Sequence, residues 1–249
     1  MLTFWLTPYG HSRRWLGRMK LSDRSYYTLK RLHSLTGVVP VGLFLLEHLY
    51  TNARSLQGPE AFDQAAAELA RLPFVVLLEA FGIWLPILFH MVVGILISTT
   101  AQANAGKHGY ARNWQYTLQR GSGLLLVFYL LYHTWALRFD PHYLHAASAY
   151  QYVNHHLAEP AVMAFYVLGT IAACYHFGNG LFGFAIHWGL VTGRGAQRNM
   201  ARLGLAIFLG LSLVGIAALF GFRGLRLDFL QKPHGTEHGT VVLGTGASR

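Results

Sequence analysis

Four histidines lie inside apolar stretches of this 249-residue chain, where an ionisable side chain is costly and marks a functional site by default. They are His48, His90, His133 and His176, separated by 42, 43 and 43 residues. Two imidazoles that face each other suit the iron of a haem b, and two such pairs predict two haems. Zinc is a weaker interpretation, because two histidines alone leave its tetrahedral site incomplete. The remaining alternative is four buried histidines that hydrogen-bond to neighbouring helices.

The composition places these histidines in a membrane. Hydrophobic residues make up 53% of the chain and charged residues only 12%, about half the 25% usual in a soluble domain. The net charge of +10 on so apolar a chain indicates membrane topology rather than nucleic-acid binding. The single cysteine, Cys174, excludes a disulfide framework and a cysteine-based zinc site.

Five apolar segments are long enough to cross about 30 Å of hydrocarbon at about 1.5 Å per residue. We therefore predict an all-α integral membrane protein with five transmembrane helices, of which the first four form a dihaem-binding bundle. The expected spans are residues 35–52, 74–99, 121–137, 161–190 and 203–222. The first and third are short but can be extended through residues 26–34 and 114–119. Pro73 and Pro160 lie where the second and fourth helices should begin.

The basic residues indicate the orientation of these spans. Of the 20 Lys and Arg residues, 13 fall on the side of the N-terminus and seven on the other side. The positive-inside rule then predicts a cytoplasmic N-terminus and an external C-terminus. The expected regions are an N-terminal segment with the start of helix one (1–34), the membrane domain (35–222) and a polar tail (223–249). No signal peptide is expected, because the apolar start precedes the arginines.

Depth in the membrane pairs the four histidines. His48 lies near the outer end of outward-running helix one, and His133 lies near the outer end of helix three. His90 follows Pro73 by 17 residues, about 25 Å along a helix that runs inward, so it belongs to the inner half. His176 lies at a similar depth on helix four. The predicted pairs are therefore His48 with His133, and His90 with His176.

Two glycines accompany the inner pair. Gly94 and Gly180 each follow an inner histidine by four residues and so lie on the same helical face as that histidine. A missing side chain at this place suits the approach of a flat macrocycle.

Several sequence runs resemble a known family. The runs are KRLHSLTGVVPVGLFLLEHL (30–49), LPILFHMVVG (85–94), NAGKHGYARNWQYTLQRGSG (104–123), YHTW (132–135) and YHFGNGLFGFAIHWG (175–189). They resemble the cytochrome b558 subunit of succinate dehydrogenase, the five-helix dihaem anchor of type B succinate:quinone oxidoreductases and fumarate reductases. The resemblance covers about residues 25–222 and leaves out residues 1–23 and the tail.

The resemblance implies that His48 and His133 hold a distal haem b, and that His90 and His176 hold a proximal haem b. It also implies two soluble partners on the cytoplasmic face, a flavoprotein with FAD and an iron–sulfur subunit. Electrons from succinate would pass through these partners and the anchor to menaquinone, or in reverse for fumarate reduction. The chain would then be the membrane subunit of an enzyme in a bacterial or archaeal cytoplasmic membrane, without dicarboxylate chemistry of its own.

Polar residues at the helix ends are candidates for haem propionates or quinone. The inner-side candidates are Arg31, His33, Ser34, Arg120 and His187, and the outer-side candidate is Arg138. Interfacial anchoring explains Arg31 and His187 equally well. Quinone chemistry needs a proton donor or acceptor, and the family places a carboxylate in the outer loop that holds Glu60 and Asp63. Asp63 is favoured, and an ordinary solvated acid is the alternative.

Two carboxylates, Glu47 and Glu79, lie within the spans, so each should be neutral or paired.

Two other functions are alternatives to a succinate dehydrogenase anchor. One is a dihaem anchor of another quinone-linked enzyme, a hydrogenase or a formate dehydrogenase. Another is a haem-free transporter with the histidines as a proton path, although five spans do not divide into two inverted halves.

Overall fold

The computed structural model describes residues 15–16, 19–20, 22–99 and 110–227. This part of the chain is helical apart from one antiparallel pair of two-residue strands, β1 (Trp15–Leu16) and β2 (Met19–Lys20). Half of the predicted N-terminal segment (1–34) and most of the polar tail (223–249) lie outside the described residues.

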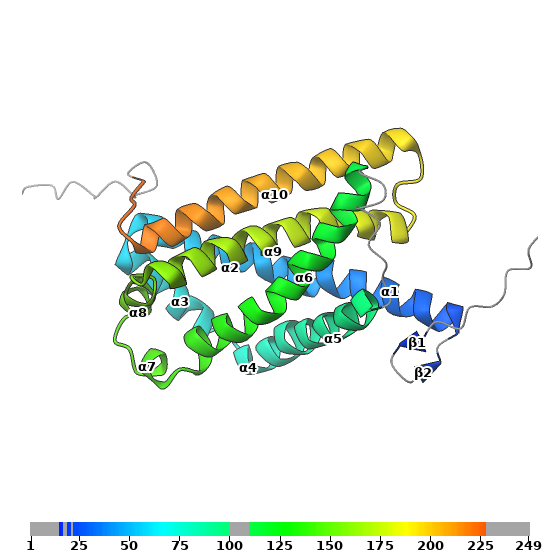
Figure 1. The fold of residues 1–249 in the computed structure, drawn as a ribbon. Helices are drawn as coiled ribbons and strands as arrows, with labels where there is room; N and C mark the ends of the chain where they lie inside the picture. Colours follow the sequence, from blue (N-terminus) through cyan, green and yellow to red (C-terminus); the bar gives the residue numbers. More distant parts are fainter. Residues whose placement is uncertain (1–14, 17–18, 21, 100–109, 228–249) are drawn as a thin grey trace, which may run out of the picture.

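Long helices dominate the described chain, and short helices connect them near one end (Figure 1). In chain order they are α1 (Asp23–Val38), α2 (Pro40–Ala53), the 3-10 helix η1 (Arg54–Gln57), α3 (Pro59–Ala70), α4 (Val75–Leu77), the π-helix η2 (Leu78–Trp84), α5 (Leu85–Thr99), α6 (Ala111–Thr134), the π-helix η3 (Trp135–Phe139), α7 (Pro141–Leu144), α8 (Ala149–His156), α9 (Pro160–His187) and α10 (Arg194–Phe222). We call the end with α3, α7 and α8 the outer end, and the end where α1 begins and α9 stops the inner end, after the predicted orientation.

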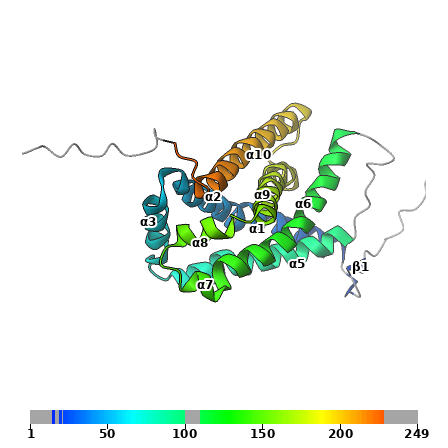
Figure 2. The same ribbon diagram turned by 60° about the vertical axis from the view of Figure 1, so that its left-hand side comes forward.

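Helix α9 occupies the middle of the bundle. It contacts α10 most extensively, and it also contacts α6 and α1. Figures 1 and 2 show α9 between α10 and the layer that α1 and α5 form. Two glycines let α9 and α10 approach closely, since a Cβ on Gly178 or Gly204 would collide with the backbone carbonyl oxygen of the other.

Four helical segments are long and apolar enough to cross a membrane. They are Asp23–Gln57, Val75–Thr99, Pro160–His187 and Arg194–Phe222. The third expected span is also helical, and the 24 residues of α6 rise about 36 Å. However, its first turns carry polar residues such as Arg112 and Arg120, and it does not share the apolar composition of the other four. The fifth crossing therefore stays a prediction.

Prolines set several helix boundaries. Pro160 is the first residue of α9, as predicted, because its missing N–H has no partner to lose there. Pro73 instead lies in a turn, and the second membrane segment begins at Val75, after Phe74 in a left-handed conformation (φ 57°). Pro86 is the second residue of α5, which directly follows the π-helix η2, and the wider turns of η2 adapt the hydrogen-bond ladder to a residue that cannot donate.

A hydrogen-bond network around Arg226, which we call the polar clasp, connects the helices at the outer end of α10. The Arg226 guanidinium donates to the carbonyl oxygens of Gly221 (2.7 Å) and Ser55 (3.2 Å) and to the Tyr150 hydroxyl (2.9 Å). Tyr150 donates in turn to the Gly221 carbonyl oxygen at 2.8 Å. Phe222 and Tyr150 belong to the buried aromatic cluster beside this network. The clasp thus joins η1, α8 and the end of α10.

The substitution Arg226→Met is expected to destabilise the protein by about 1–3 kcal/mol, because it removes the hydrogen bonds of a charged donor that join η1, α8 and the end of α10. Thermal unfolding of the solubilised protein measures the loss. Arg71→Met, at an exposed position, is the control and should unfold like the wild type. Equal stability of the two variants would contradict the role of the clasp.

Candidate functional site

The outer pair of histidines meets between α2 and α6. The ring centres of His48 and His133 are 5.6 Å apart and the rings are perpendicular, at 90°. Asn52 fixes His48 from one turn away: its amide nitrogen donates to the His48 carbonyl oxygen (2.7 Å) and lies 3.4 Å from Nε2 of the ring. The Nδ1 atom of His133 is buried and has no hydrogen-bond partner in the structure.

Tyrosines surround the outer pair. Tyr129 stacks on His133 with ring centres 5.4 Å apart and an angle of 16°. Gly169 on α9 admits this tyrosine, since a Cβ there would collide with the Tyr129 ring. Tyr166 packs against His133 at 5.6 Å, and its buried hydroxyl has no hydrogen-bond partner among the described residues. Buried polar atoms without partners are uncommon in proteins and point to a group that binds beside them.

The inner pair meets between α5 and α9. The ring centres of His90 and His176 are 6.0 Å apart, at an interplanar angle of 86°. Nδ1 of His90 donates to the His33 carbonyl oxygen (2.9 Å), and Nδ1 of His176 donates to the Gln119 carbonyl oxygen (3.1 Å). Because a carbonyl oxygen can only accept, each contact places the proton on Nδ1. Each ring then keeps the lone pair of Nε2 for a metal.

Glycines on the neighbouring helices make room for the inner rings. A Cβ at Gly37 would collide with the His90 ring, and a Cβ at Gly123 would lie 3.0 Å from Cε1 of His176. Glycines within the spans are expected from the sequence to allow close helix approach, but the ring that each of these two faces could not be predicted, because it lies on a different helix. Gly94 and Gly180 face His33 and Gln119 instead, with Nε2 atoms 2.9 Å and 3.4 Å from an added Cβ. Their contact with a macrocycle stays a prediction.

Comparisons with known proteins identify the family of the chain. Residues 110–219 match the model of the family described as "Succinate dehydrogenase/Fumarate reductase transmembrane subunit". The chain is also 40% identical over 200 residues to the "Succinate dehydrogenase cytochrome b558 subunit" of Bacillus subtilis (strain 168), which covers 80% of this chain and 98% of that relative. The chain belongs to this family of transmembrane subunits. It is thus the membrane anchor subunit of an oxidoreductase complex.

At the inner end of this transmembrane subunit, several predicted site residues lie together. The Arg31 guanidinium stacks on the Trp188 ring at 4.0 Å, and the Trp188 indole donates to the Ser34 hydroxyl at 3.2 Å. Tyr27 donates to the His187 carbonyl oxygen at 3.3 Å. Helix α1 is therefore fastened to the end of α9 by these polar contacts.

Two further inner candidates have aromatic neighbours. His33 stacks on His90 with ring centres 3.9 Å apart at 16°. The Arg120 guanidinium lies over the Tyr116 ring at 3.5 Å. Three buried nitrogen atoms of the inner candidates have no hydrogen-bond partner in the described part of the chain: Nε of Arg31, Nε of Arg120 and Nδ1 of His187. The inner end thus offers several donor groups suited to an anion.

The carboxylates of this subunit have different surroundings. Asp63 accepts hydrogen bonds from the Ser148 hydroxyl (2.6 Å) and the Tyr150 backbone N–H (2.8 Å), so it joins α3 to the start of α8. Glu60 is exposed. Glu79 forms an ion pair with Arg138 at 2.9 Å, which confirms that this carboxylate within a span is paired.

Glu47 and Asp140 are each bonded locally. Glu47 accepts a hydrogen bond from the Thr51 hydroxyl at 2.5 Å, one helical turn away. Asp140, at the start of α7 in the outer connection, accepts from the backbone N–H of His142 (2.8 Å) and from its ring. These two contacts hold the pKa of Asp140 below its usual value.

The contacts of the inner rings predict different effects of alanine at two glycines in α6. Gly123→Ala should destabilise the protein relative to Gly121→Ala, because the new Cβ presses on His176, whereas nothing lies within 4 Å of a Cβ at Gly121. Both variants gain similar helix propensity, so the difference isolates the contact, about 1 kcal/mol or more. Thermal unfolding measures it. Equal unfolding temperatures would show that Gly123 does not shape the His176 environment.

Proposed function

We propose that this chain is a dihaem cytochrome b anchor of succinate dehydrogenase, which passes electrons from the iron–sulfur subunit to menaquinone and serves fumarate reduction in reverse. His48 and His133 would hold the distal haem b, and His90 and His176 the proximal one. The observation that carries the proposal is the meeting of these four histidines as two pairs at two depths of the bundle. The Bacillus subtilis relative is a cytochrome b558, a name that implies haem b.

The residues present fit two haems. The ring-centre separations of 5.6 Å and 6.0 Å suit one metal ion between two imidazoles, with a metal–nitrogen bond of about 2 Å on each side. No group of three or more His, Cys, Asp or Glu side chains in the described chain could hold a metal ion, whereas a pair of imidazoles is a donor set that could hold a haem b. When bound, each haem supplies a one-electron carrier within the membrane.

The protein's own groups would hold and orient the haems. The His33 and Gln119 carbonyl oxygens set the tautomer and the direction of the inner rings, a constraint that also raises ligand basicity. We assign the free donors of Arg31, Arg120 and His187, together with His33 and Ser34, to the proximal propionates. Charge-assisted hydrogen bonds to carboxylates are the strong ones, so these contacts would also fix the depth of the macrocycle.

Arg138 is our candidate for a distal propionate. One of its terminal nitrogens already pairs with Glu79, but a guanidinium has five N–H donors and can bond a second carboxylate. Glu79, which lies on the second membrane segment, would then hold Arg138 in position for the propionate.

We assign quinone-linked proton transfer to the outer carboxylates, with Asp63 first and Glu60 second. Asp63 is fixed by two donors and so has a defined position, whereas Glu60 is exposed and free to exchange protons with solvent. A positioned carboxylate near the interface is what proton transfer to a reduced quinone needs.

The family match favours the flavoprotein and iron–sulfur subunits of succinate dehydrogenase as partners, rather than those of a hydrogenase or formate dehydrogenase. A bacterial or archaeal cytoplasmic membrane is the expected location. The soluble partners would dock at the inner end, where the basic residues gather.

The haem content of the purified complex tests the ligand assignment. A reduced-minus-oxidised spectrum and a pyridine haemochrome assay should give two haems b per chain. His48→Ala and His90→Ala should each remove one, with different absorption bands, because they belong to different pairs. His145→Ala, at an exposed loop position, is the control and should keep both. A chain without haem would overturn the proposal, and loss of the same band in both variants would overturn the pairing.

The carboxylate assignment is tested by quinone kinetics. Asp63→Asn should lower kcat for menaquinone reduction by about 10²-fold or more, the usual contribution of a positioned acid or base. Glu60→Gln should have a smaller effect, and succinate oxidation with an artificial acceptor should be unchanged in both. Ser148→Ala removes a hydrogen-bond donor to Asp63 without removing the carboxylate, and so reports the structural contribution alone. If Ser148→Ala lowers quinone turnover as much as Asp63→Asn, the role of Asp63 is structural.

A further inference from the structure

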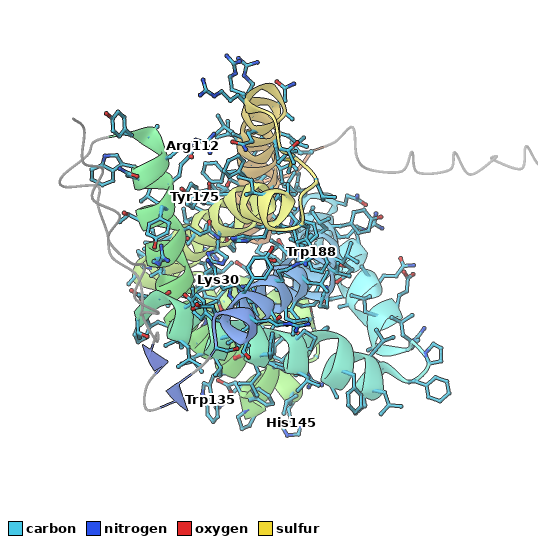
Figure 3. All side chains as sticks on the ribbon, turned by 90° about the vertical axis from the view of Figure 1, so that its right-hand side faces the viewer. Lys30, Arg112, Trp135, His145, Tyr175 and Trp188 are labelled. Carbon is cyan, nitrogen blue, oxygen red and sulfur yellow. The ribbon has the colours of Figure 1, made fainter. Side chains whose placement is uncertain are left out.

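Three arginines form a row on the first turns of α10 at the inner end. Arg194, Arg198 and Arg202 are spaced by four residues, so their side chains lie on one face of the helix. All three are exposed. None of the three side chains forms a hydrogen bond or ion pair with any residue in the described part of the chain. Figure 3, which looks at this end, shows nitrogen-tipped side chains projecting from the start of α10, away from the other helices.

The same helical face continues as an apolar stripe. Leu205, Leu209 and Leu213 follow Arg202 at intervals of three, four and four residues, and Phe220 follows two turns later. Their exposed fractions are 55%, 56%, 72% and 46%. This side of α10 therefore has the character of a surface in contact with lipid.

The opposite face of α10 is occupied by the protein itself. Gly204, Gly215 and Phe222 are buried there, where α10 packs on α9, α2 and η1. The arginine row consequently points outward, away from the histidine pairs. It has no part in holding the groups assigned above.

The inner end contains almost no acid that could neutralise this row. Asp23 is the only carboxylate of the described chain at that end. The other described carboxylates lie in the spans or at the outer end, and they are Glu47, Glu60, Asp63, Glu68, Glu79, Asp140 and Glu159. Within the described chain no carboxylate pairs with the arginine row, so its charge is open to water and to anionic groups that approach from outside.

We propose that this face of α10 is a binding site for an anionic phospholipid of the adjoining leaflet. Arg198 and Arg202 would bind the phosphate, with Arg194 adding charge nearer the water. One acyl chain would lie along Leu205, Leu209 and Leu213. An acidic protein surface would account for the arginines, but not for their continuation into exposed leucines on the same face. A lipid with a charged head and an apolar chain accounts for both.

Lipid retention by the purified complex, with its soluble subunits attached, tests the proposal. The complex is exchanged into detergent with equal amounts of phosphatidylglycerol and phosphatidylcholine, and bound lipids are counted by native mass spectrometry. The double variant R198Q and R202Q should lower the preference for phosphatidylglycerol about 30-fold, since each arginine near an anionic surface contributes about fivefold. The control R54Q and R71Q removes the same charge at the outer end and should keep the preference.

Two further experiments distinguish a long-chain lipid from a free phosphate group as the partner of the arginine row. L209Q should weaken retention of long-chain phosphatidylglycerol but not of its dihexanoyl form, because only the long chain reaches that turn. Inorganic phosphate at millimolar concentration should not displace the long-chain lipid. An unchanged lipid preference in R198Q/R202Q would overturn the proposal. Loss of the soluble subunits from that variant with lipid preference intact would overturn it as well, and would assign the row to protein docking.

Discussion

The rest of this structure depends on one constraint: imidazole rings inside an apolar helical bundle need partners for their nitrogen atoms. Each ring has two nitrogens, and a buried polar atom without a partner is costly. For the inner rings, one nitrogen bonds to a backbone carbonyl oxygen on a neighbouring helix, and the other is left for a ligand. Such contacts require the helices to be very close, which explains why glycines face the rings at Gly37 and Gly123.

Through these carbonyl contacts, α1 and α6 also orient histidines that lie on other helices. The His33 carbonyl oxygen lies on α1 and orients His90 of α5, and the Gln119 carbonyl oxygen lies on α6 and orients His176 of α9. Each inner ring is therefore positioned by a helix that does not carry it. Since α6 carries an outer histidine as well, a shift of this one helix would disturb both pairs at once.

Sequence reasoning predicted the pairing because depth in a membrane follows from residue number alone. A rise of about 1.5 Å per residue, counted from a helix start, suffices to place His90 level with His176. Contacts that depend on helix rotation could not be obtained in this way. Gly37 and Gly123 face rings of other helices, and the Arg138–Glu79 pair joins residues 59 positions apart. The two-residue error at Pro73 has a similar origin, because the left-handed Phe74 delays the helix.

The two ends of the bundle differ in how their polar groups are satisfied, and this difference bears on what each end does. At the outer end, Asp63, Tyr150 and Arg226 bond to one another's helices and close the structure on itself. At the inner end, Arg31 and Arg120 stack on aromatic rings, and the described residues offer no hydrogen-bond partner to the buried Nε of either. Stacking holds a guanidinium in place while leaving its edge available for an anion. The connections at the outer end are therefore held together by contacts within the chain, whereas the inner arginines each leave a buried donor that could bond an anion.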